Sequence, residues 1–340
     1  MKISLQSFLL AISVSALISC AQKNLSTEKD IIPSPVEIIK SDGLFTFKSG
    51  MSLYINDKNL APAHTLLQNS LEIDLVESHE ELSASIVLRM IEGMKEGGYH
   101  LSVNNDRLLL EASDYSGIVA GISTIRQLLP IEAESGLSIP NVEITDYPHY
   151  QWRGMHLDVS RHFYSKKEVM KLLDLMSLYK FNKFHWHLTD DQGWRIEIKK
   201  YPLLTEKGAW RKYNDQDRTC MQLEKSMRNP DYAIPTDKTS VIEGDTIYGG
   251  FYTQDEIKEV VNYAAERGID VIPEIDMPGH FLAAIQQYPD IACDGLIGWG
   301  KYSLHRYVWE RILHWNFAKI SGVKFFKCFL MNTCIWGETR

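Results

Sequence analysis

The chain has 340 residues, of which 44% are hydrophobic and 24% charged, and its formal net charge at pH 7 is −8. This length fits one or two domains, and the hydrophobic content suffices for a packed core. Because a nucleic-acid-binding surface is normally basic, the acidic balance gives no indication of a nucleic-acid partner.

The N-terminus is expected to be a targeting segment. Lys2 precedes an apolar run, Phe8–Ile18, that is too short to span a bilayer and typical of a signal peptide. The run leads into Leu17-Ile18-Ser19-Cys20, which resembles a bacterial lipobox, where cleavage precedes a cysteine that is then lipidated. We therefore expect residues 1–20 to be a lipoprotein signal peptide. Lipidated Cys20 would anchor the protein in a bacterial cell envelope, on the outer membrane or a periplasmic face. The alternative is a plain signal peptide with an incidental cysteine.

A small α+β domain is predicted for residues 21–147, after a polar tether that runs to about residue 32. Strands are expected at Leu44–Phe47, Ser52–Ile55, Ala84–Met90, Gly98–Val103 and Arg107–Glu111, and helices at Ala61–Ser70 and Tyr115–Leu129. Asn104-Asn105-Asp106 is expected to form a hairpin turn. The domain shows no constellation of reactive groups, so a scaffold role is predicted.

A strand–helix–strand unit follows the boundary at Asp146-Tyr147-Pro148. Met155–Val159 and Lys183–Leu188 have the pattern of short strands, and Ser165–Tyr179 has the apolar spacing of a helix that begins with a capping box. This order implies parallel strands. Carboxylates stand where the strands end, at Asp158, Asp190 and Asp191. Parallel α/β barrels carry their chemistry at such ends.

A second unit follows a long connection. Lys199–Gly249 is polar and rich in proline, and is expected to be an irregular, functional loop. Thr253–Gly268 is predicted to be a capped helix and Asp270–Ile275 a third strand, with another helix beginning over His280–Tyr288.

Three blocks in these units carry a family resemblance. They are Arg153-Gly154 with Asp158 and Ser160-Arg161-His162, His185-Trp186-His187-Leu188 with Asp190-Asp191, and Pro273–His280. In these blocks the chain resembles the family-twenty glycoside hydrolases, the β-N-acetylhexosaminidases. The resemblance implies an α/β fold, an incomplete TIM (β/α)8 barrel over residues 148–295, preceded by the small α+β domain.

The resemblance also implies a substrate and a mechanism. Glycoside hydrolysis commonly takes two carboxyl groups across the scissile bond. In this family the 2-acetamido oxygen of the substrate attacks the anomeric carbon, so the enzyme supplies an acid for the leaving oxygen and a carboxylate that orients the acetamido group. The family places both on an Asp-Glu pair at a fourth strand, and no residue of this chain is assigned either role.

Supporting residues are assigned by the same resemblance. Arg153 is expected to bind sugar hydroxyls, with a salt bridge to Asp158 or Asp190 as the alternative. Asp190 is expected to face the site, and Asp191 to brace the loop; a solvated turn is the alternative for this pair.

Asp276 and His280 stand four residues apart, so a hydrogen bond between them is sterically easy. The resemblance implies that this pair tunes the general acid. The alternative is a helix N-cap aspartate beside a satisfied histidine. Glu274 is expected to point into the barrel by alternation and to join the same network.

No metal or other cofactor is expected. His185 and His187 point to one face of their strand and His156 is near in sequence, but no third ligand follows at metal-ligand spacing, and the resembled family uses no metal. Burial in the core is expected, in preference to stacking on sugar rings, for three tryptophans: Trp152, Trp186 and Trp194.

Residues 296–340 are predicted to be an aberrant tail. They carry seven Lys or Arg against two Asp or Glu, and show no further βα unit. Codons permitted for Cys328–Arg340, read two bases further on, allow His-(Leu or Met)-Gly-Gly-Asp-Glu, which resembles the fourth strand of the family, His-Ile-Gly-Gly-Asp-Glu. A frameshift between about Asp294 and His305 is therefore hypothesised.

The leading hypothesis is an enzyme that removes terminal non-reducing N-acetylhexosamines from β-linked glycans containing N-acetylglucosamine or N-acetylgalactosamine, in a catalytically incomplete form. The alternatives are an inactive sugar-binding surface lipoprotein and a pseudogene product that does not fold. Because three parallel strands leave an open edge, low solubility is expected for the chain.

Overall fold

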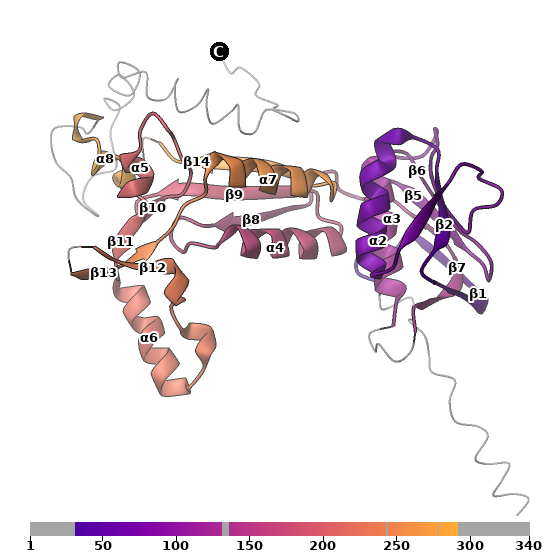
Figure 1. The fold of residues 1–340 in the computed structure, drawn as a ribbon, viewed down its shortest axis with the longest axis horizontal. Helices are drawn as coiled ribbons and strands as arrows, with labels where there is room; N and C mark the ends of the chain where they lie inside the picture. Colours follow the sequence, from indigo (N-terminus) through magenta and orange to yellow (C-terminus); the bar gives the residue numbers. More distant parts are fainter. Residues whose placement is uncertain (1–30, 131–135, 243, 278, 292–340) are drawn as a thin grey trace, which may run out of the picture.

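The computed structural model describes residues 31–130, 136–242, 244–277 and 279–291, which form two bodies joined by residues 147–153 (Figure 1). The predicted signal peptide, lipidated Cys20 and the tail at residues 296–340 lie outside the described residues and stay predictions. In the described part, no helix combines the length and apolar character needed to cross a membrane.

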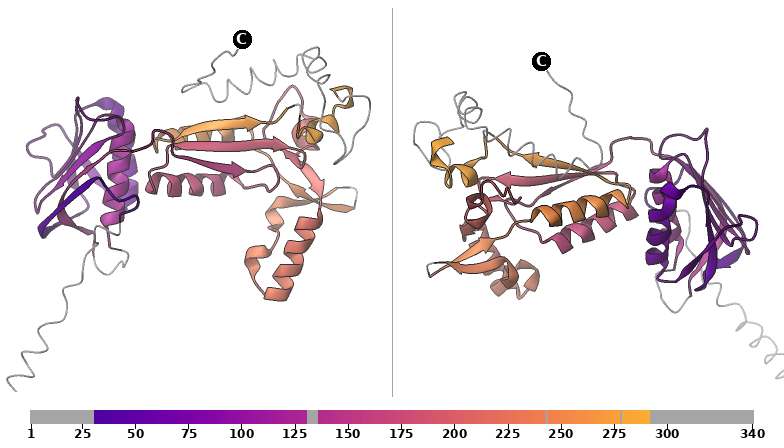
Figure 2. Two further views of the ribbon diagram at one scale, coloured as in Figure 1. Left: turned by 180° about the vertical axis from the view of Figure 1, so that it is seen from behind. Right: turned by 45° about the horizontal axis from the view of Figure 1, so that its top comes forward.

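The first body is a seven-stranded mixed sheet with two helices on one face (Figures 1 and 2). The sheet has the strand order β1-β7-β5-β6-β4-β2-β3. Its strands are β1 (Glu37–Thr46), β2 (Met51–Ile55), β3 (Leu75–Ser78), β4 (Ile86–Met90), β5 (Tyr99–Val103), β6 (Leu108–Ala112) and β7 (Ser138–Asp146). The helices are α2 (Ala61–Leu71) and α3 (Tyr115–Leu128), preceded by the short 3-10 turn η2 (Lys58–Leu60).

The predicted α+β class and the β5–β6 hairpin are confirmed. β5 and β6 pair antiparallel, and the Asn104 side chain accepts bonds from the backbone nitrogens of Asp106 and Arg107 at the turn. The sequence pattern missed β3 and β7, and β1 begins at Glu37 instead of Leu44. β7 lies between β1 and β5, so its pairing is set by contacts distant in sequence.

The second body is built on parallel strands. β8 (Gly154–Asp158) and β14 (Asp270–Ile275) both pair parallel with β9 (Lys183–Asp190), while the two-residue strand β10 (Gly193–Trp194) turns back on β9. Helices α4 (Lys166–Leu178) and α7 (Gln254–Ala265) connect them. The predicted βα units are confirmed, as are the capping boxes at Ser165 and Thr253.

Alternation along β9 sorts its side chains between two faces of the sheet. Phe184, Trp186 and Leu188 are fully buried in the core that contains apolar residues of α4 and α7. His185 and His187 therefore point to the opposite face, which is the inner face of a (β/α) barrel. The described strands thus form one segment of such a barrel, with both helices outside.

The connection between the two units is more regular than predicted. Lys199–Gly249 contains α5 (Leu203–Glu206), α6 (Asp215–Met227), the 3-10 turns η4 (Pro230–Tyr232) and η5 (Thr236–Lys238), and a three-stranded antiparallel sheet of β11 (Trp210–Lys212), β12 (Thr239–Ile242) and β13 (Asp245–Gly249). The expectation of an irregular loop was wrong because these strands are short and pair only with one another. We call residues 210–249 the insertion; its helix α6 projects away from the parallel strands (Figures 1 and 2).

The helix predicted to begin at His280 is also corrected. α8 begins at Leu282 and ends at Ile285, and the 3-10 turn η6 (Pro289–Ile291) follows it.

Polar contacts join the two bodies along α3. Ser123 Oγ donates to Ser177 O at 2.8 Å, and Gln127 Nε2 to Leu178 O at 2.8 Å. Behind them, the ammonium of Lys180 lies 2.8 Å from Asp146 Oδ2 and donates to Tyr99 OH at 3.1 Å. Burial lowers the pKa of Lys180, and the Asp146 carboxylate opposes that shift.

The buried pair generates a first prediction. Asp146→Asn would leave the Lys180 ammonium buried without a counter-charge, which typically costs about 3 kcal/mol of unfolding free energy. Urea unfolding at pH 7 should show this loss, and Lys180→Met in the same chain should restore most of it. The control is Asp245→Asn, which breaks the exposed pair with Lys212 and should cost less than about 1 kcal/mol. Equal effects of both aspartate changes would contradict the prediction.

Candidate active site

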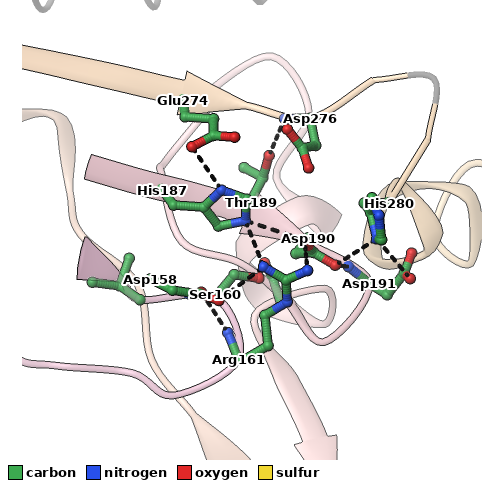
Figure 3. A network of polar contacts seen from close by, with 12 residues as sticks. Asp158, Ser160, Arg161, His187, Thr189, Asp190, Asp191, Glu274, Asp276 and His280 are labelled. Atoms are coloured by element: carbon green, nitrogen blue, oxygen red, sulfur yellow. Dashed lines mark hydrogen bonds and ion pairs between the residues drawn. The ribbon is translucent and has the colours of Figure 1, made fainter. Parts of the chain in front are cut away.

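The carboxyl ends of the three parallel strands bring charged side chains to one edge of the sheet (Figure 3). Strand register places Asp158 of β8 and Glu274 of β14 both opposite His187 of β9. Asp190 ends β9, and Asp276 and His280 follow β14. The parallel pairing alone therefore gathers residues that are more than a hundred positions apart in sequence.

Asp190 is the centre of this cluster, with 1% of its surface exposed. One carboxylate oxygen lies 2.5 Å from Arg161 Nη2 and 3.1 Å from His187 Nε2. The other accepts the Asp191 backbone N–H at 2.6 Å and lies 3.3 Å from His280 Nδ1. Burial alone would raise the pKa of Asp190, but these donors outweigh it and lower the pKa. The carboxylate is therefore ionised in the site.

His187 bridges two carboxylates. Its Nε2 faces Asp190, and its Nδ1 lies 3.0 Å from Glu274 Oε2. Burial of the ring lowers the pKa of His187, yet the two carboxylates raise it to about 9. The ring is thus an imidazolium at neutral pH. Arg161 Nη1 lies 3.1 Å from the same Nε2, but a protonated ring nitrogen cannot accept a hydrogen bond. Arg161 Nη1 therefore donates to Asp158 Oδ2, at 2.8 Å.

The structure corrects the expected position of Arg153. This arginine precedes β8, at the end of the strand opposite to Asp158, where its guanidinium donates to Lys180 O at 2.7 Å and to Tyr150 O at 2.8 Å. The arginine beside Asp190 is Arg161, three residues after Asp158. The signal was in the sequence, because an active-site side chain of a parallel barrel is expected after the strand and not before it.

The expected Asp276–His280 hydrogen bond is also not the contact observed. His280 Nδ1 instead lies between Asp190 Oδ1 at 3.3 Å and Asp191 Oδ2 at 3.5 Å, and its ring is 59% exposed. The backbone N–H of Asp276 donates to Thr189 Oγ1 at 3.2 Å, and burial raises the pKa of the Asp276 carboxyl. His280 has a φ of 52°, and its ring is turned toward Asp190 and Asp191.

Two further expectations are met by the contacts. Asp191 Oδ1 accepts the Leu282 backbone N–H at 3.1 Å, which braces the start of α8 as predicted. Glu274 points to the inner face and belongs to the same network through His187. The N-cap alternative for Asp276 is not seen, since Phe281 stands at the N-cap of α8 without a side-chain cap bond.

Tryptophan positions follow the expectation of burial for two of three residues. Trp186 and Trp194 lie in the core. Trp152 is 63% exposed, but it precedes β8 and its ring lies 5.8 Å from Lys183 Nζ, away from the Asp190 cluster.

Arg195, which sequence reasoning did not single out, holds the turn that carries Arg161. Its guanidinium is fully buried and donates only to backbone carbonyls: Val159 at 3.0 Å, Ser160 at 2.6 Å, Gly250 at 3.1 Å, and Ala209. Burial lowers the pKa of Arg195 to about 10. A side chain at Gly193 would collide with this guanidinium, since a Cβ there would lie 2.3 Å from its central carbon. One side chain thus fixes three segments: the end of β8, the start of β11 and the end of β13.

The insertion is fastened to the same region. Lys238 Nζ donates to Glu168 Oε1 at 2.9 Å, on the capping box of α4. Arg211 pairs with Asp217 and donates to Arg161 O at 3.2 Å. These contacts tie the insertion to the helix and the turn that flank the Asp190 cluster.

Four side chains of the inner face have atoms that bind metals. His156, His187 and Glu274 offer ligand atoms within 4.8 Å of one another, and His185 Nε2 lies 2.6 Å from Glu274 Oε2. The carboxylate of this group comes from another strand, so sequence spacing did not reveal it.

Parallel βα units with a charged cluster at their carboxyl ends define the active-site edge of an enzyme of the TIM-barrel class. The glycosyl hydrolase family 20 catalytic domain model matches residues 150–327, and the model of domain 2 of that family matches residues 28–147. The chain therefore belongs to glycosyl hydrolase family 20.

Relatives and solved structures agree with this assignment. The chain is 41% identical to a β-hexosaminidase of Vibrio furnissii, over 76% of this chain and 39% of that protein, and 36% identical to one of Porphyromonas gingivalis, over 82% and 35%. An exo β-N-acetylglucosaminidase of Vibrio harveyi, solved with N-acetylglucosamine, aligns with a TM-score of 0.72 and 31% identity over 92% of this chain and 47% of that one. The chain thus spans less than half of the length of these relatives.

The charge of His187 gives a prediction about pH. In metal-free buffer, the imidazole should titrate near pH 9 by NMR, against 6.5 for an unperturbed ring, and Asp190→Asn should move the midpoint down. Because the folded pKa is raised, the stabilisation by this ring is complete below about pH 6.5 and lost as the pH rises toward 9. A titration midpoint of His187 at or below 6.5 in the unmodified chain would contradict its contacts with both Asp190 and Glu274.

The carbonyl-binding role of Arg195 gives a prediction about stability. Arg195→Met would leave four buried carbonyls without their donor, and a loss of about 3 kcal/mol or more in urea unfolding is expected. Arg195→Lys, with three donors instead of five, should recover only part of it. The control is Arg218→Met on α6, since that exposed arginine donates to a single carbonyl, Tyr213 O. A loss of unfolding free energy no larger than that of the control would show that the hydrogen bonds of Arg195 are unimportant for stability.

Proposed function

We propose that the chain belongs to an enzyme that hydrolyses terminal non-reducing N-acetylhexosamine residues from β-linked glycans. The observation that carries the proposal is the ionised, buried Asp190 with Arg161 and His280 around it, at the carboxyl strand ends of a family 20 chain. The substrate class is supported by the relatives, which are named β-hexosaminidases, and by the solved relative that holds N-acetylglucosamine.

In this proposal the described residues bind and orient the sugar. Arg161 takes the hydroxyl-binding role first assigned to Arg153, because its guanidinium is held at the site by Asp158 and Asp190 while 39% of the side chain stays exposed. His280 fixes its Nδ1 against the two aspartates, which leaves the exposed Nε2 toward the site. The 2-acetamido oxygen acts as the nucleophile, and neither the acid nor the acetamido-orienting carboxylate is assigned to a residue of this chain.

The test compares the two arginines in the full chain. N-acetylglucosamine binding is measured by saturation-transfer NMR, and hydrolysis by release of the chromophore from a 4-nitrophenyl N-acetyl-β-glucosaminide. Arg161→Met should weaken sugar binding at least tenfold, because a charge-assisted hydrogen bond is worth about 1.5–3 kcal/mol. The matched variant Arg153→Met should leave binding unchanged.

The outcomes separate the candidate functions. Chromophore release supports the hydrolase. Sugar binding without release supports a sugar-binding lipoprotein as the function of this 340-residue chain, to which neither catalytic carboxyl group is assigned. Neither binding nor release, from a chain that melts cooperatively, would refute both.

We also propose that the protein is anchored to the bacterial envelope by acyl chains on Cys20. The support is the Leu17-Ile18-Ser19-Cys20 sequence after an apolar run, and each buried methylene of an acyl chain contributes about 0.8 kcal/mol to membrane binding. Cys20→Ser should move the protein from the detergent phase to the aqueous phase in a cloud-point partition. An unmodified Cys20 by mass spectrometry would overturn this proposal.

A further inference from the structure

Helices α4 and α7 end in the same backbone motif. After α4, Lys180 has a φ of 61°, and the N–H of the following residue donates to Met176 O at 2.9 Å. After α7, Gly268 has a φ of 65°, and the N–H of the following residue donates to Ala264 O at 2.9 Å. Both are Schellman motifs, in which a residue in the left-handed conformation ends the helix and two backbone hydrogen bonds close its last turn.

One carbonyl of each helix end is left without a partner by this motif, and α3 donates to both. The carbonyl stands two residues before the left-handed residue, at Leu178 in α4 and at Glu266 in α7. Gln127 Nε2 donates to Leu178 O at 2.8 Å, and Tyr115 OH donates to Glu266 O at 2.7 Å. A single helix of the first body therefore completes two barrel helices at equivalent positions, and Figures 1 and 2 show the ends of both helices directed at α3.

The residues that end the two helices also contact the first body. A Cβ added to Gly268 would lie 3.6 Å from Ser116 Cα and 3.7 Å from Val119 Cβ, so the turn after α7 packs closely on α3. Lys180 stands where glycine is favoured, because the left-handed conformation is unfavourable for a residue with a side chain. Its ammonium lies 2.8 Å from Asp146 Oδ2, and this buried ion pair offsets the cost.

The two turns lead directly into the parallel strands. Asn182, which precedes β9, donates its N–H to Arg153 O at 3.0 Å, and its carbonyl accepts the N–H of Asp270, the first residue of β14, at 3.0 Å. Arg153 Nε donates to Lys180 O at 2.7 Å. The amino ends of β8, β9 and β14 are thus tied to one another and to the turn after α4, so the position of that turn affects all three strands.

We propose that α3 positions the parallel strands of the barrel, because by completing the ends of α4 and α7 it fixes the turns from which β9 and β14 start. Gln127 and Tyr115 are positioning residues in this sense, since they act through the helix ends, at the opposite end of the strands from Asp190. The first body then has a defined mechanical role in the barrel. This inference does not depend on the proposed sugar hydrolysis.

The test is amide hydrogen exchange in the full chain, followed by NMR at single residues, because exchange reports the local opening of a helix end. Tyr115→Phe removes only the hydroxyl group. Exchange should become about fivefold faster at the N–H groups of Gly268 and Ile269, which is the factor expected for the net contribution of one hydrogen bond. Exchange at Lys180 and Phe181 should stay unchanged.

Gln127 gives the reciprocal test. Gln127→Met has no donor for Leu178 O, so exchange at Lys180 and Phe181 should become faster by a similar factor, without an effect at the end of α7. Gln127→Lys should restore protection there, because a lysine side chain can donate to the last carbonyls of a helix.

The control is Tyr54→Phe, which should leave exchange at both helix ends unchanged. Tyr54 lies on the opposite face of the sheet, since its neighbour Leu53 is the residue buried in the core under the helices. Unchanged exchange at either helix end in its matching variant, or faster exchange spread evenly over both bodies, would overturn the proposal. Because no sugar is present, such a failure would leave the hydrolase proposal standing, and loss of glycosidase function would leave the role of α3 standing.

Discussion

The arrangement of the site depends on one buried negative charge, the carboxylate of Asp190. An ionised carboxylate in a protein interior is tolerated only when charged or polar donors surround it. Its donors come from the turn after β8, from β9 itself and from the loop after β14. The charge therefore acts as a common fixed point for three segments that are far apart in sequence, and displacement of any one segment would remove one of its donors.

Compensation of Asp190 gives His187 a double role. One nitrogen of the ring contacts Asp190 at the carboxyl edge of the sheet, and the other contacts Glu274 on the inner face. The two carboxylates are thus not independent, because both contact the same ring. This links the chemistry at the rim of the barrel to the packing of its interior.

Local signals were sufficient to predict the framework of the second body. The capping boxes at Ser165 and Thr253 and the apolar spacing after them fixed both helices, and the strand ends located Asp158 and Asp190. Contacts that depend on three-dimensional placement were not predictable in this way. Arg153 and Arg161 lie in the same block, and the direction of the strand, which places Arg161 after β8, separates the half-buried structural arginine from the one in the site.

The partner of His280 illustrates the same limit. Spacing of four residues favoured Asp276, but the ring of His280 contacts Asp190 of a different strand. Likewise, no local pattern identified β7 or the insertion strands. Arg195 gave no signal because its ligands are backbone carbonyls, which are the same in every sequence.

The fastening of the insertion has a consequence for how related chains could diverge. Lys238 holds it at the capping box of α4, and Arg211 at the backbone of Arg161, so both attachments lie outside the parallel strands. Helix α6 and the 3-10 turn η4 could be lengthened, shortened or exchanged between those two anchor points without disturbing the Asp190 fixed point. Variation in the insertion would then leave the barrel unchanged, as loops of different length do on one framework.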